Sequence, residues 1–221
     1  MQYAIIAILF FFLFTNTIQC ICQTNYTVIY NHTAYLDSNA NKPFKELKGA
    51  LYVMNDTMTV YRIIRKEKDM MRKLNLSSSD AHHGTINPLK QDFYYDVVHL
   101  YDQDFDVKIP RDTTKWIIDS TKPISILNIK CFSAQADNTI IWFAPSIPLK
   151  AGPLHFFVLP GLVLAVYNSK YNFVYIANKI IPEIPEIIRS KKNRVKTLEE
   201  YKALQMIRVS RFNNQPRIKT L

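Results

Sequence analysis

Residues 156–168 read F-F-V-L-P-G-L-V-L-A-V-Y-N and predict a proline–glycine turn followed by a strand. Pro160 presets a φ of about −65° at the second position of a turn. Gly161 accepts the positive φ that the third position of a type II turn requires. The residues after this glycine are apolar at every position, which predicts a strand covered on both faces. Asn168-Ser169-Lys170 then reverses the chain, so the stretch predicts a central hairpin with a structural glycine at its start.

Short runs with a period of two recur along the rest of the chain. Residues 50–54 and 58–64, separated by Asn55-Asp56-Thr57, predict a hairpin with a tight turn. β-branched and aromatic residues predict further strands at 93–101, 116–118, 124–132, 139–143, 162–167 and 173–181. No helix is predicted between them, so an antiparallel sheet is favoured over βαβ units. Residues 70–88 have the composition of a loop.

The C-terminal region differs from the rest. Thr197-Leu198-Glu199-Glu200 has the form of a capping box and predicts a helix over residues 198–209 with an incomplete apolar stripe, which suits docking on a sheet. Prolines make residues 181–186 an extended connector or a sheet edge. Residues 189–221 carry ten Lys and Arg against two Glu, so this basic tail holds +8 of the net charge of +10. Such a tail is typical of a solvated extension, the alternative being contact with a polyanion or a membrane surface.

The N-terminus begins with an unbroken apolar run at residues 4–14. Eleven residues are too few to span a bilayer, which takes about 20, but they suit the apolar core of a signal peptide. We therefore expect a signal peptide at 1–22, a β domain at 23–188 and the basic tail at 189–221, with no transmembrane helix after signal removal. The alternatives are a buried N-terminal strand and lipidation of Cys20.

Three cysteines are present, Cys20, Cys22 and Cys131. The first two leave with the predicted signal peptide, so the mature chain has no intramolecular disulfide. Cys131 lies in an apolar strand-like run, where a lone thiol is typical of a small core residue.

Titratable residues offer two candidate clusters for metal or acid–base chemistry. One contains Asp80, His82, His83 and His99, and the other contains Asp102, Asp104 and Asp106, which a regular strand would place on one face. Neither has the spacing of a known metal motif, and the acids are more typical of a solvated face. No glycine-rich phosphate loop, nucleophile elbow or C-x-x-C pair occurs. We therefore predict no metal, no cofactor and no catalytic residues.

Aromatic residues make up 13% of the chain and cluster at Phe93-Tyr94-Tyr95, Trp142-Phe143 and Phe156-Phe157. Most of these are core residues. The remainder predict a groove for an apolar or peptide ligand, because concave sites are built largely from such side chains.

Residues 158–163, V-L-P-G-L-V, resemble the G-L-P-G-L-I motif of the GLPGLI family of exported proteins. Upstream, residues 142–148, W-F-A-P-S-I-P, resemble that family's W-Y-T-P-E-I-P, followed by Gly152-Pro153. Weaker similarity involves Trp116, Lys122, Cys131 and the K-T-L-E-E-Y-K-A-L of the tail. Val158 and Ser146 depart from the pattern, which puts any shared charged site in doubt. The motif residues, which we expect to be mainly structural, are Trp142, Pro145, Pro148, Leu159, Pro160, Gly161 and Leu162.

The resemblance implies export and a mainly β fold, and it implies no activity or ligand. We expect a curved antiparallel sheet or half-barrel, similar to bacterial lipoprotein carriers, wrapping a C-terminal helix. The predicted function is a non-enzymatic binding or carrier-like role for an apolar ligand, a peptide or an envelope partner, in the periplasm, at the outer membrane or outside the cell. The alternatives are a hydrolase or other enzyme using scattered residues such as His82, His99 and Asp104, and a structural envelope component. A nucleic-acid partner is not expected.

Overall fold

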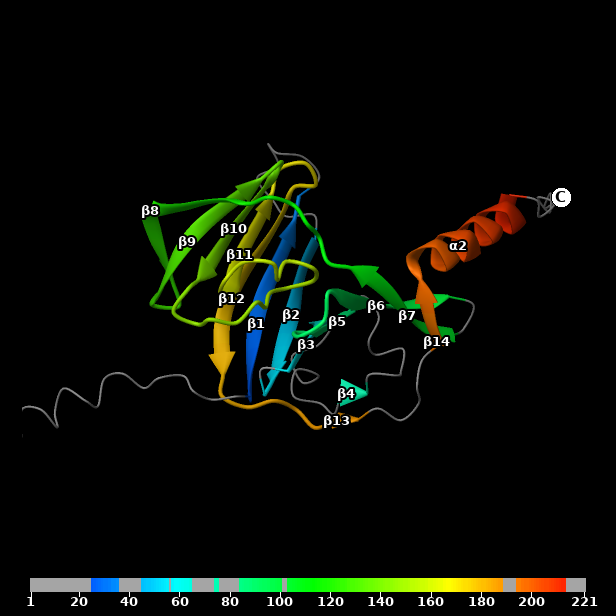
Figure 1. The fold of residues 1–221 in the computed structure, drawn as a ribbon, viewed down its shortest axis with the longest axis horizontal. Helices are drawn as coiled ribbons and strands as arrows, with labels where there is room; N and C mark the ends of the chain where they lie inside the picture. Colours follow the sequence, from blue (N-terminus) through cyan, green and yellow to red (C-terminus); the bar gives the residue numbers. More distant parts are fainter. Residues whose placement is uncertain are drawn as a thin grey trace, which may run out of the picture.

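The computed structural model describes residues 25–35, 45–55, 57–64, 74–75, 84–100, 103–188 and 194–213. Over these residues the chain is mainly β, as the sequence predicts, and forms an open, curved sheet followed by a C-terminal helix (Figure 1). The strands are β1 (Asn25–Ala34), β2 (Lys45–Met54), β3 (Met58–Ile64), β4 (Leu74–Asn75), β5 (Gly84–Pro88), β6 (Phe93–Leu100), β7 (Gln103–Pro110), β8 (Ile117–Ile126), β9 (Ile129–Ala136), β10 (Thr139–Ala144), β11 (Leu162–Asn168), β12 (Phe173–Ile181), β13 (Ile187–Ile188) and β14 (Arg194–Thr197).

Twelve strands form the main sheet in the order β14-β7-β6-β5-β3-β2-β1-β12-β11-β10-β9-β8. Neighbouring strands are antiparallel except β14, which runs parallel to β7. β1 lies between β2 and β12, where Thr27 pairs with Ile181. The first described strand therefore joins the two halves of the chain. β4 and β13 form a separate parallel pair.

The predicted hairpins at β2–β3 and β11–β12 are confirmed. Asn55 makes the first turn with a φ of 44°, a conformation that asparagine tolerates better than most residues. In the second turn the Tyr171 amide donates a hydrogen bond to Asn168 Oδ1, at 2.8 Å. Residues 162–166 of β11 are all buried, so this strand is covered on both faces as expected.

The strand predicted at residues 124–132 is wrong, because the chain turns in its middle. Leu127 and Asn128 have φ values of 53° and 61°. Two successive positive φ values are characteristic of the type I′ turn that joins adjacent antiparallel strands. β8 therefore contains both Ile117-Ile118 and Ile124, which the sequence assigned to two separate strands. β9 begins only at Ile129.

The loop predicted at residues 70–88 is also partly wrong. Residues 84–88 form β5, which pairs with β3 and β6 and buries Thr85 and Ile86. Neighbouring strands cover this short run, although its own sequence has only one large apolar residue. Residues 74–75 form β4. The remainder of the predicted loop lies outside the described residues.

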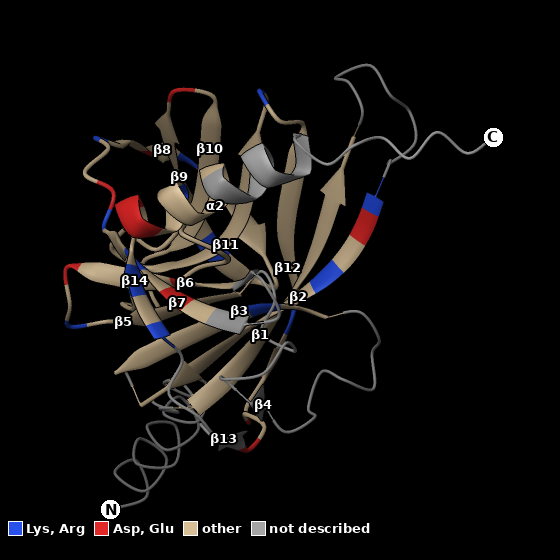
Figure 2. Ribbon diagram, turned by 90° about the vertical axis from the view of Figure 1, so that its right-hand side faces the viewer, with Lys and Arg blue, Asp and Glu red and all other residues tan. Residues whose placement is uncertain are grey.

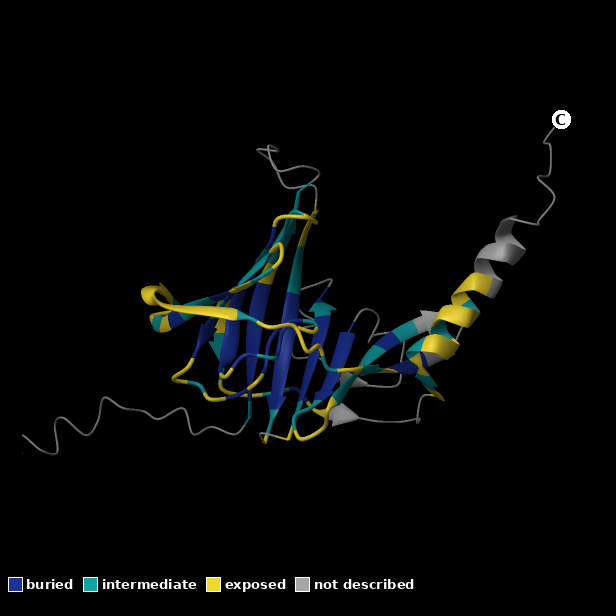
Figure 3. Ribbon diagram, turned by 45° about the horizontal axis from the view of Figure 1, so that its top comes forward, coloured by how far each residue is buried: buried dark blue, intermediate teal, exposed yellow. Residues whose placement is uncertain are grey.

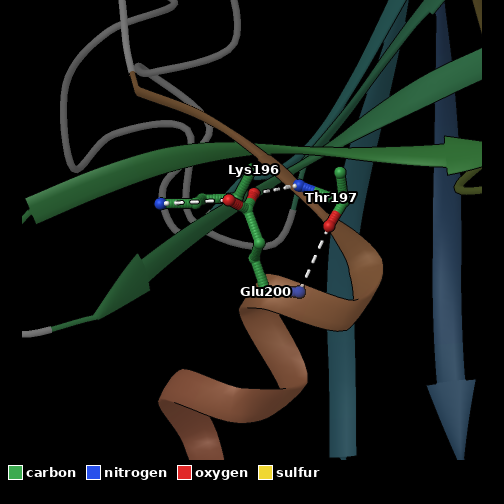
Figure 4. A network of polar contacts seen from close by, with 3 residues as sticks. All are labelled: Lys196, Thr197 and Glu200. Atoms are coloured by element: carbon green, nitrogen blue, oxygen red, sulfur yellow. Dashed lines mark hydrogen bonds and ion pairs between the residues drawn. The ribbon is translucent and has the colours of Figure 1, made fainter.

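The helix α2 (Leu198–Asn213) begins at the predicted capping box and continues four residues beyond the predicted end at 209. The Thr197 amide donates to Glu200 Oε2 at 2.8 Å, and the Glu200 amide donates to Thr197 Oγ1 at 3.2 Å (Figure 4). Lys196 Nζ lies 3.6 Å from Glu200 Oε1. These contacts satisfy two amides that a helix N-terminus leaves without partners.

α2 lies at one edge of the sheet and is not wrapped by it (Figure 1). Its apolar residues Leu198, Tyr201 and Leu204 pack against Phe105 and Val107 of β7. The strand that precedes it, β14, belongs to the predicted basic tail and yet extends the sheet. No helix in the described part of the chain is both long enough and apolar enough to cross a membrane.

Both faces of the central strands are buried (Figure 3). On one face, Val28 and Tyr30 of β1 and Leu51 and Val53 of β2 join a large apolar core. On the other face, Ile29, Ala50 and Tyr52 join a smaller one. Charged residues lie mainly at strand ends and connections (Figure 2).

Residues 181–186, predicted to be an extended connector or a sheet edge, link β12 to β13. After Ile181 this connector contains no helix or strand before β13. Thr27 Oγ1 donates to Glu183 O at 2.7 Å, and Ile181 and Ile184 pack against the smaller core.

Candidate functional site

Residues 145–161, which we call the strap, connect β10 to β11 across one face of the sheet (Figure 1). At its base the amides of Leu162 and Val163 donate to the carbonyls of Ile147 and Ala151, at 3.0 and 2.8 Å. At its far end Thr85 Oγ1 of β5 donates to Leu154 O at 2.9 Å. The strap therefore reaches from β10 and β11 to strands in the other half of the sheet.

Apolar side chains of the strap fill the face that it crosses. Leu149, Ala151, Phe156 and Leu159 are buried in the same core as Tyr30 and Leu51. Phe157 packs edge-on against Tyr94 and lies under the guanidinium of Arg111. The sequence predicts an apolar groove on the curved sheet, but this face of the sheet is covered by the chain itself.

The predicted motif residues lie in β10, in the strap and at the start of β11. Leu159 and Leu162 are fully buried, Trp142 is half-buried, and Pro145, Pro148 and Pro160 are exposed. The Ile147 amide donates to Ala144 O at 3.2 Å, which closes the strap's first turn. This hydrogen bond helps to fix the path of the strap, and the structural role of the motif residues stays a prediction.

The prediction of a positive φ at Gly161 is wrong, since no described glycine has one. The Gly161 amide donates to Leu159 O at 2.9 Å, across Pro160. A glycine is required for space: a Cβ at Gly161 would collide with Ala144 O and lie 2.8 Å from its carbonyl carbon. The close approach of two backbones, and not a type II turn, explains this residue.

An aromatic cluster lies under the strap, and sequence reasoning did not identify it as a unit. It consists of Tyr30, His32, Tyr61, Phe156, Phe173 and Tyr175. The rings of His32 and Tyr175 stack with centroids 4.2 Å apart and planes 10° apart. The other pairs meet edge-on or tilted at 5.5 to 6.3 Å, the arrangement that aromatic quadrupoles favour. The strap contributes Phe156 and is therefore part of the aromatic cluster.

Two polar atoms of the aromatic cluster are buried and lack a hydrogen-bond partner among the described residues: Tyr61 Oη and His32 Nδ1. Tyr30 Oη, by contrast, donates to Val163 O at 2.6 Å. Burial raises the pKa of Tyr61 well above its usual range and, with Lys45 nearby, lowers the pKa of His32. Both groups are therefore neutral near pH 7 and can form hydrogen bonds without the cost of burying a charge.

Gly49 makes room for the Tyr61 hydroxyl, because a Cβ at this position would collide with Oη. In the register, Gly49 lies opposite Tyr30 on β1 and Ile63 on β3. The glycine in β2 was the sequence signal for this site, since an isolated glycine inside a strand marks a close approach.

The predicted acid–base and metal candidates do not form a site that the structure describes. Asp80, His82, His83 and Asp102 lie outside the described residues. Among the described residues, no group of three or more His, Cys, Asp or Glu side chains is placed to hold a metal ion. The register sets His99 opposite Asp104 at the β6–β7 hairpin, but only their backbones are described. Asp106 is 1% exposed, so the expectation of a solvated face is wrong for this acid.

Cys131 is fully buried in the large core, as predicted. Burial raises the pKa of its thiol, although a backbone hydrogen bond opposes this in part. A buried, protonated thiol is a poor nucleophile, which agrees with a packing role.

Comparison of the chain with protein-family models and with curated proteins found no match. The GLPGLI resemblance therefore remains a prediction from the motif residues.

Proposed function

We propose that the protein is exported to the cell envelope and acts there as a non-enzymatic binding or carrier-like module for an apolar ligand or an apolar peptide segment. The aromatic cluster beneath the strap is the observation that carries this proposal. It provides stacked and edge-on rings and two buried polar atoms that have no hydrogen-bond partner among the described residues. Such an apolar lining with a few hydrogen-bonding groups is typical of ligand sites.

The strap is the element that a ligand would displace. Leu154, near its far end, has a φ of 51°, a conformation that costs a non-glycine residue roughly 1–2 kcal/mol. Strain of this kind persists where the surrounding contacts hold it, and it is relieved when they open. Thr85 provides the side-chain hydrogen bond that reaches the Leu154 carbonyl. A ligand that takes the place of Phe156 in the aromatic cluster would release this strained segment.

Native mass spectrometry of the protein purified from its own envelope tests the proposal. We expect a co-purifying apolar adduct on the wild-type protein. Tyr61→Phe removes only the unpartnered hydroxyl, so it should leave thermal stability unchanged or raised while lowering the amount of any adduct with a polar group. Tyr30→Phe is the matched control, because it removes a hydroxyl that is bonded within the protein and should lower stability instead. Protein without any adduct would contradict the proposal.

Export rests on the apolar run at residues 4–14 and on the family resemblance. Intact mass measurement of the purified protein should show a chain that begins at Gln23. A cytosolic product that retains Met1 would contradict export without bearing on ligand binding.

An enzymatic role is the second candidate, and the register that sets His99 opposite Asp104 favours it. Hydrolysis of model esters that is lost in both His99→Ala and Asp104→Asn would support this role over simple binding.

A further inference from the structure

Arg111, which directly follows β7, is held in place by neutral groups alone. Its Nε donates to Gln91 O at 2.6 Å, and its Nη2 donates to Asn87 Oδ1 at 2.7 Å and to Pro88 O at 2.9 Å. Its guanidinium carbon lies 5.0 Å from the ring centroid of Phe157. Nη1 makes no hydrogen bond within the described part of the chain. A guanidinium that is fixed in this way and keeps a free donor is suited to binding an anion.

Asn87 of β5 provides a second free donor beside Arg111. Its side chain is 1% exposed, and its Nδ2 has no hydrogen-bond partner among the described residues. Because Oδ1 accepts from Arg111, the orientation of the amide is fixed, since the opposite orientation would direct one donor at another. A buried donor without an acceptor is unfavourable. Asn87 and Arg111 together therefore lack an acceptor that a ligand can supply.

These two donors adjoin the aromatic cluster. In the register of β3 and β5, Thr85 lies directly opposite Tyr61, a member of the cluster. The Thr85 hydroxyl donates to the strap, so its side chain lies on the face that the strap crosses. Asn87 is two residues further along the same strand, which places its side chain on the same face.

The strap covers the aromatic cluster and Arg111 with consecutive residues. Phe156 packs in the cluster against Phe173, and Phe157 lies under the guanidinium of Arg111. A ligand that displaces Phe156 therefore also moves Phe157 away from Arg111. The apolar site and the two free donors become accessible in one step.

We propose that Arg111 and Asn87 bind the carboxylate of a ligand whose apolar part occupies the aromatic cluster. This inference rests on the function proposed above and adds the chemical class of the ligand. A carboxylate has two acceptor oxygens in one plane, one for Arg111 Nη1 and one for Asn87 Nδ2, and its charge is complementary to that of the guanidinium. The same head group occurs in a fatty acid and in an apolar peptide with a free carboxyl terminus.

A nearby acid favours a head group with a single charge. No carboxylate among the described residues forms an ion pair with Arg111, but Asp92 is close enough to raise the pKa of Arg111, which burial lowers. A phosphate carries up to about two negative charges near pH 7 and would be repelled more strongly by Asp92 than a carboxylate is.

Pairs of ligands that differ only in the head group test the site. Isothermal titration calorimetry of the delipidated protein compares decanoate with decanol, and an apolar hexapeptide that has a free carboxyl terminus with its amidated form. We expect the carboxylate of at least one pair to bind about tenfold more tightly than its neutral counterpart, because charge-assisted hydrogen bonds are stronger than neutral ones. The pair that shows this preference identifies the source of the carboxylate.

Two variants and one control assign the preference to these residues. Asn87→Asp keeps an oxygen for Arg111 but replaces the free donor with an acceptor, so it should lose the preference for the carboxylate and still bind the neutral ligand. Arg111→Gln should lose the preference as well. Lys170→Gln is the matched control, because Lys170 is also a cation over an aromatic ring, that of Tyr171, but lies in the β11–β12 turn. This control should keep the preference.

The outcomes separate this inference from the proposed function. Equal affinity of the wild-type protein for both members of each pair would overturn the carboxylate site and leave the apolar site standing. A wild-type protein that binds no member of either pair would overturn both. Far-UV circular dichroism establishes that each variant is folded, and a folded Asn87→Asp protein that keeps the preference would also overturn the assignment. Should Arg111→Gln fail to fold, Asn87→Asp still decides, because it preserves the acceptor for Arg111.

Discussion

Only glycine fits at position 161, because neighbouring atoms fill the space beside its Cα atom. The carbonyl of Ala144 and the ring of Phe143 occupy the space in which a side chain would begin. The colliding group is backbone and belongs to β10, which pairs with β11 at this point. Neither strand can move away without breaking that pairing.

Gly161→Ala should therefore destabilise the fold by about 1–3 kcal/mol, the usual cost of overpacking a core. Urea unfolding followed by tryptophan fluorescence measures this difference. Pro160→Ala is the control, because Pro160 is exposed and its replacement should cost less than about 1 kcal/mol. An alanine variant as stable as the wild type would show that the two backbones separate easily.

His32 should make stability depend on pH. Its pKa in the folded protein is lowered from 6.5, first by burial and then by Lys45. The unfolded chain therefore binds a proton more readily than the folded one, and stability is lost as the pH falls through about 6.5.

His32→Phe keeps a ring stacked on Tyr175 but removes this titration. The unfolding free energy of the variant should fall less steeply between about pH 7 and pH 5 than that of the wild type, in denaturant titrations at each pH. Some dependence remains, because the pKa of His155 is also lowered by burial. Parallel pH profiles for the two proteins would contradict the assignment.

At the scale of single elements, α2 depends on its first turn, because only a few of its side chains dock on the sheet. Thr197→Ala removes the hydroxyl that accepts from the Glu200 amide and should cost about 1 kcal/mol locally. Hydrogen exchange of the amides at 200–204 reports this as faster exchange. Glu200→Gln keeps an acceptor for the Thr197 amide and gives up only an exposed ion pair, so it should have a smaller effect. Equal effects of the two changes would contradict the capping role.

Elements with strong local signals could be predicted from the sequence, and those defined by their neighbours could not. The residues of the capping box and of the Asn55 turn favour these structures locally, and the sequence predicted both. The turn at Leu127-Asn128 has no glycine and lies within an apolar run, so periodicity alone joined two strands into one. β5 is buried by β3 and β6, which its own short sequence does not reveal.

At the scale of the whole molecule, the candidate site is a product of topology. His32 and Tyr175 stack because β1 and β12 are neighbours, although 143 positions separate them in the chain. Tyr61 comes from β3 and Phe156 from the strap, so no local window of sequence contains the aromatic cluster. The sequence predicted an aromatic surplus and an antiparallel sheet, and the family resemblance implied that the sheet is curved, but the pairing of β1 with β12 decides which rings meet.

Truncation tests this dependence on topology. A chain that ends at residue 172 lacks β12 and leaves one side of β1 without a partner, so it should lose cooperative thermal unfolding. A chain that ends at residue 193 lacks, among the described elements, only β14 and α2 and should keep cooperative unfolding. Calorimetry distinguishes the two. A cooperative transition in the shorter chain would show that β1 to β11 fold without closure by β12.

The central place of β1 also governs the order of events during synthesis. β1, the first strand of the described residues, pairs with β12, so the native hydrogen bonds on one side of β1 form only when about 150 further residues are available. Until then one side of β1 lacks its native partner, so a partly synthesised chain should unfold more easily than the finished protein.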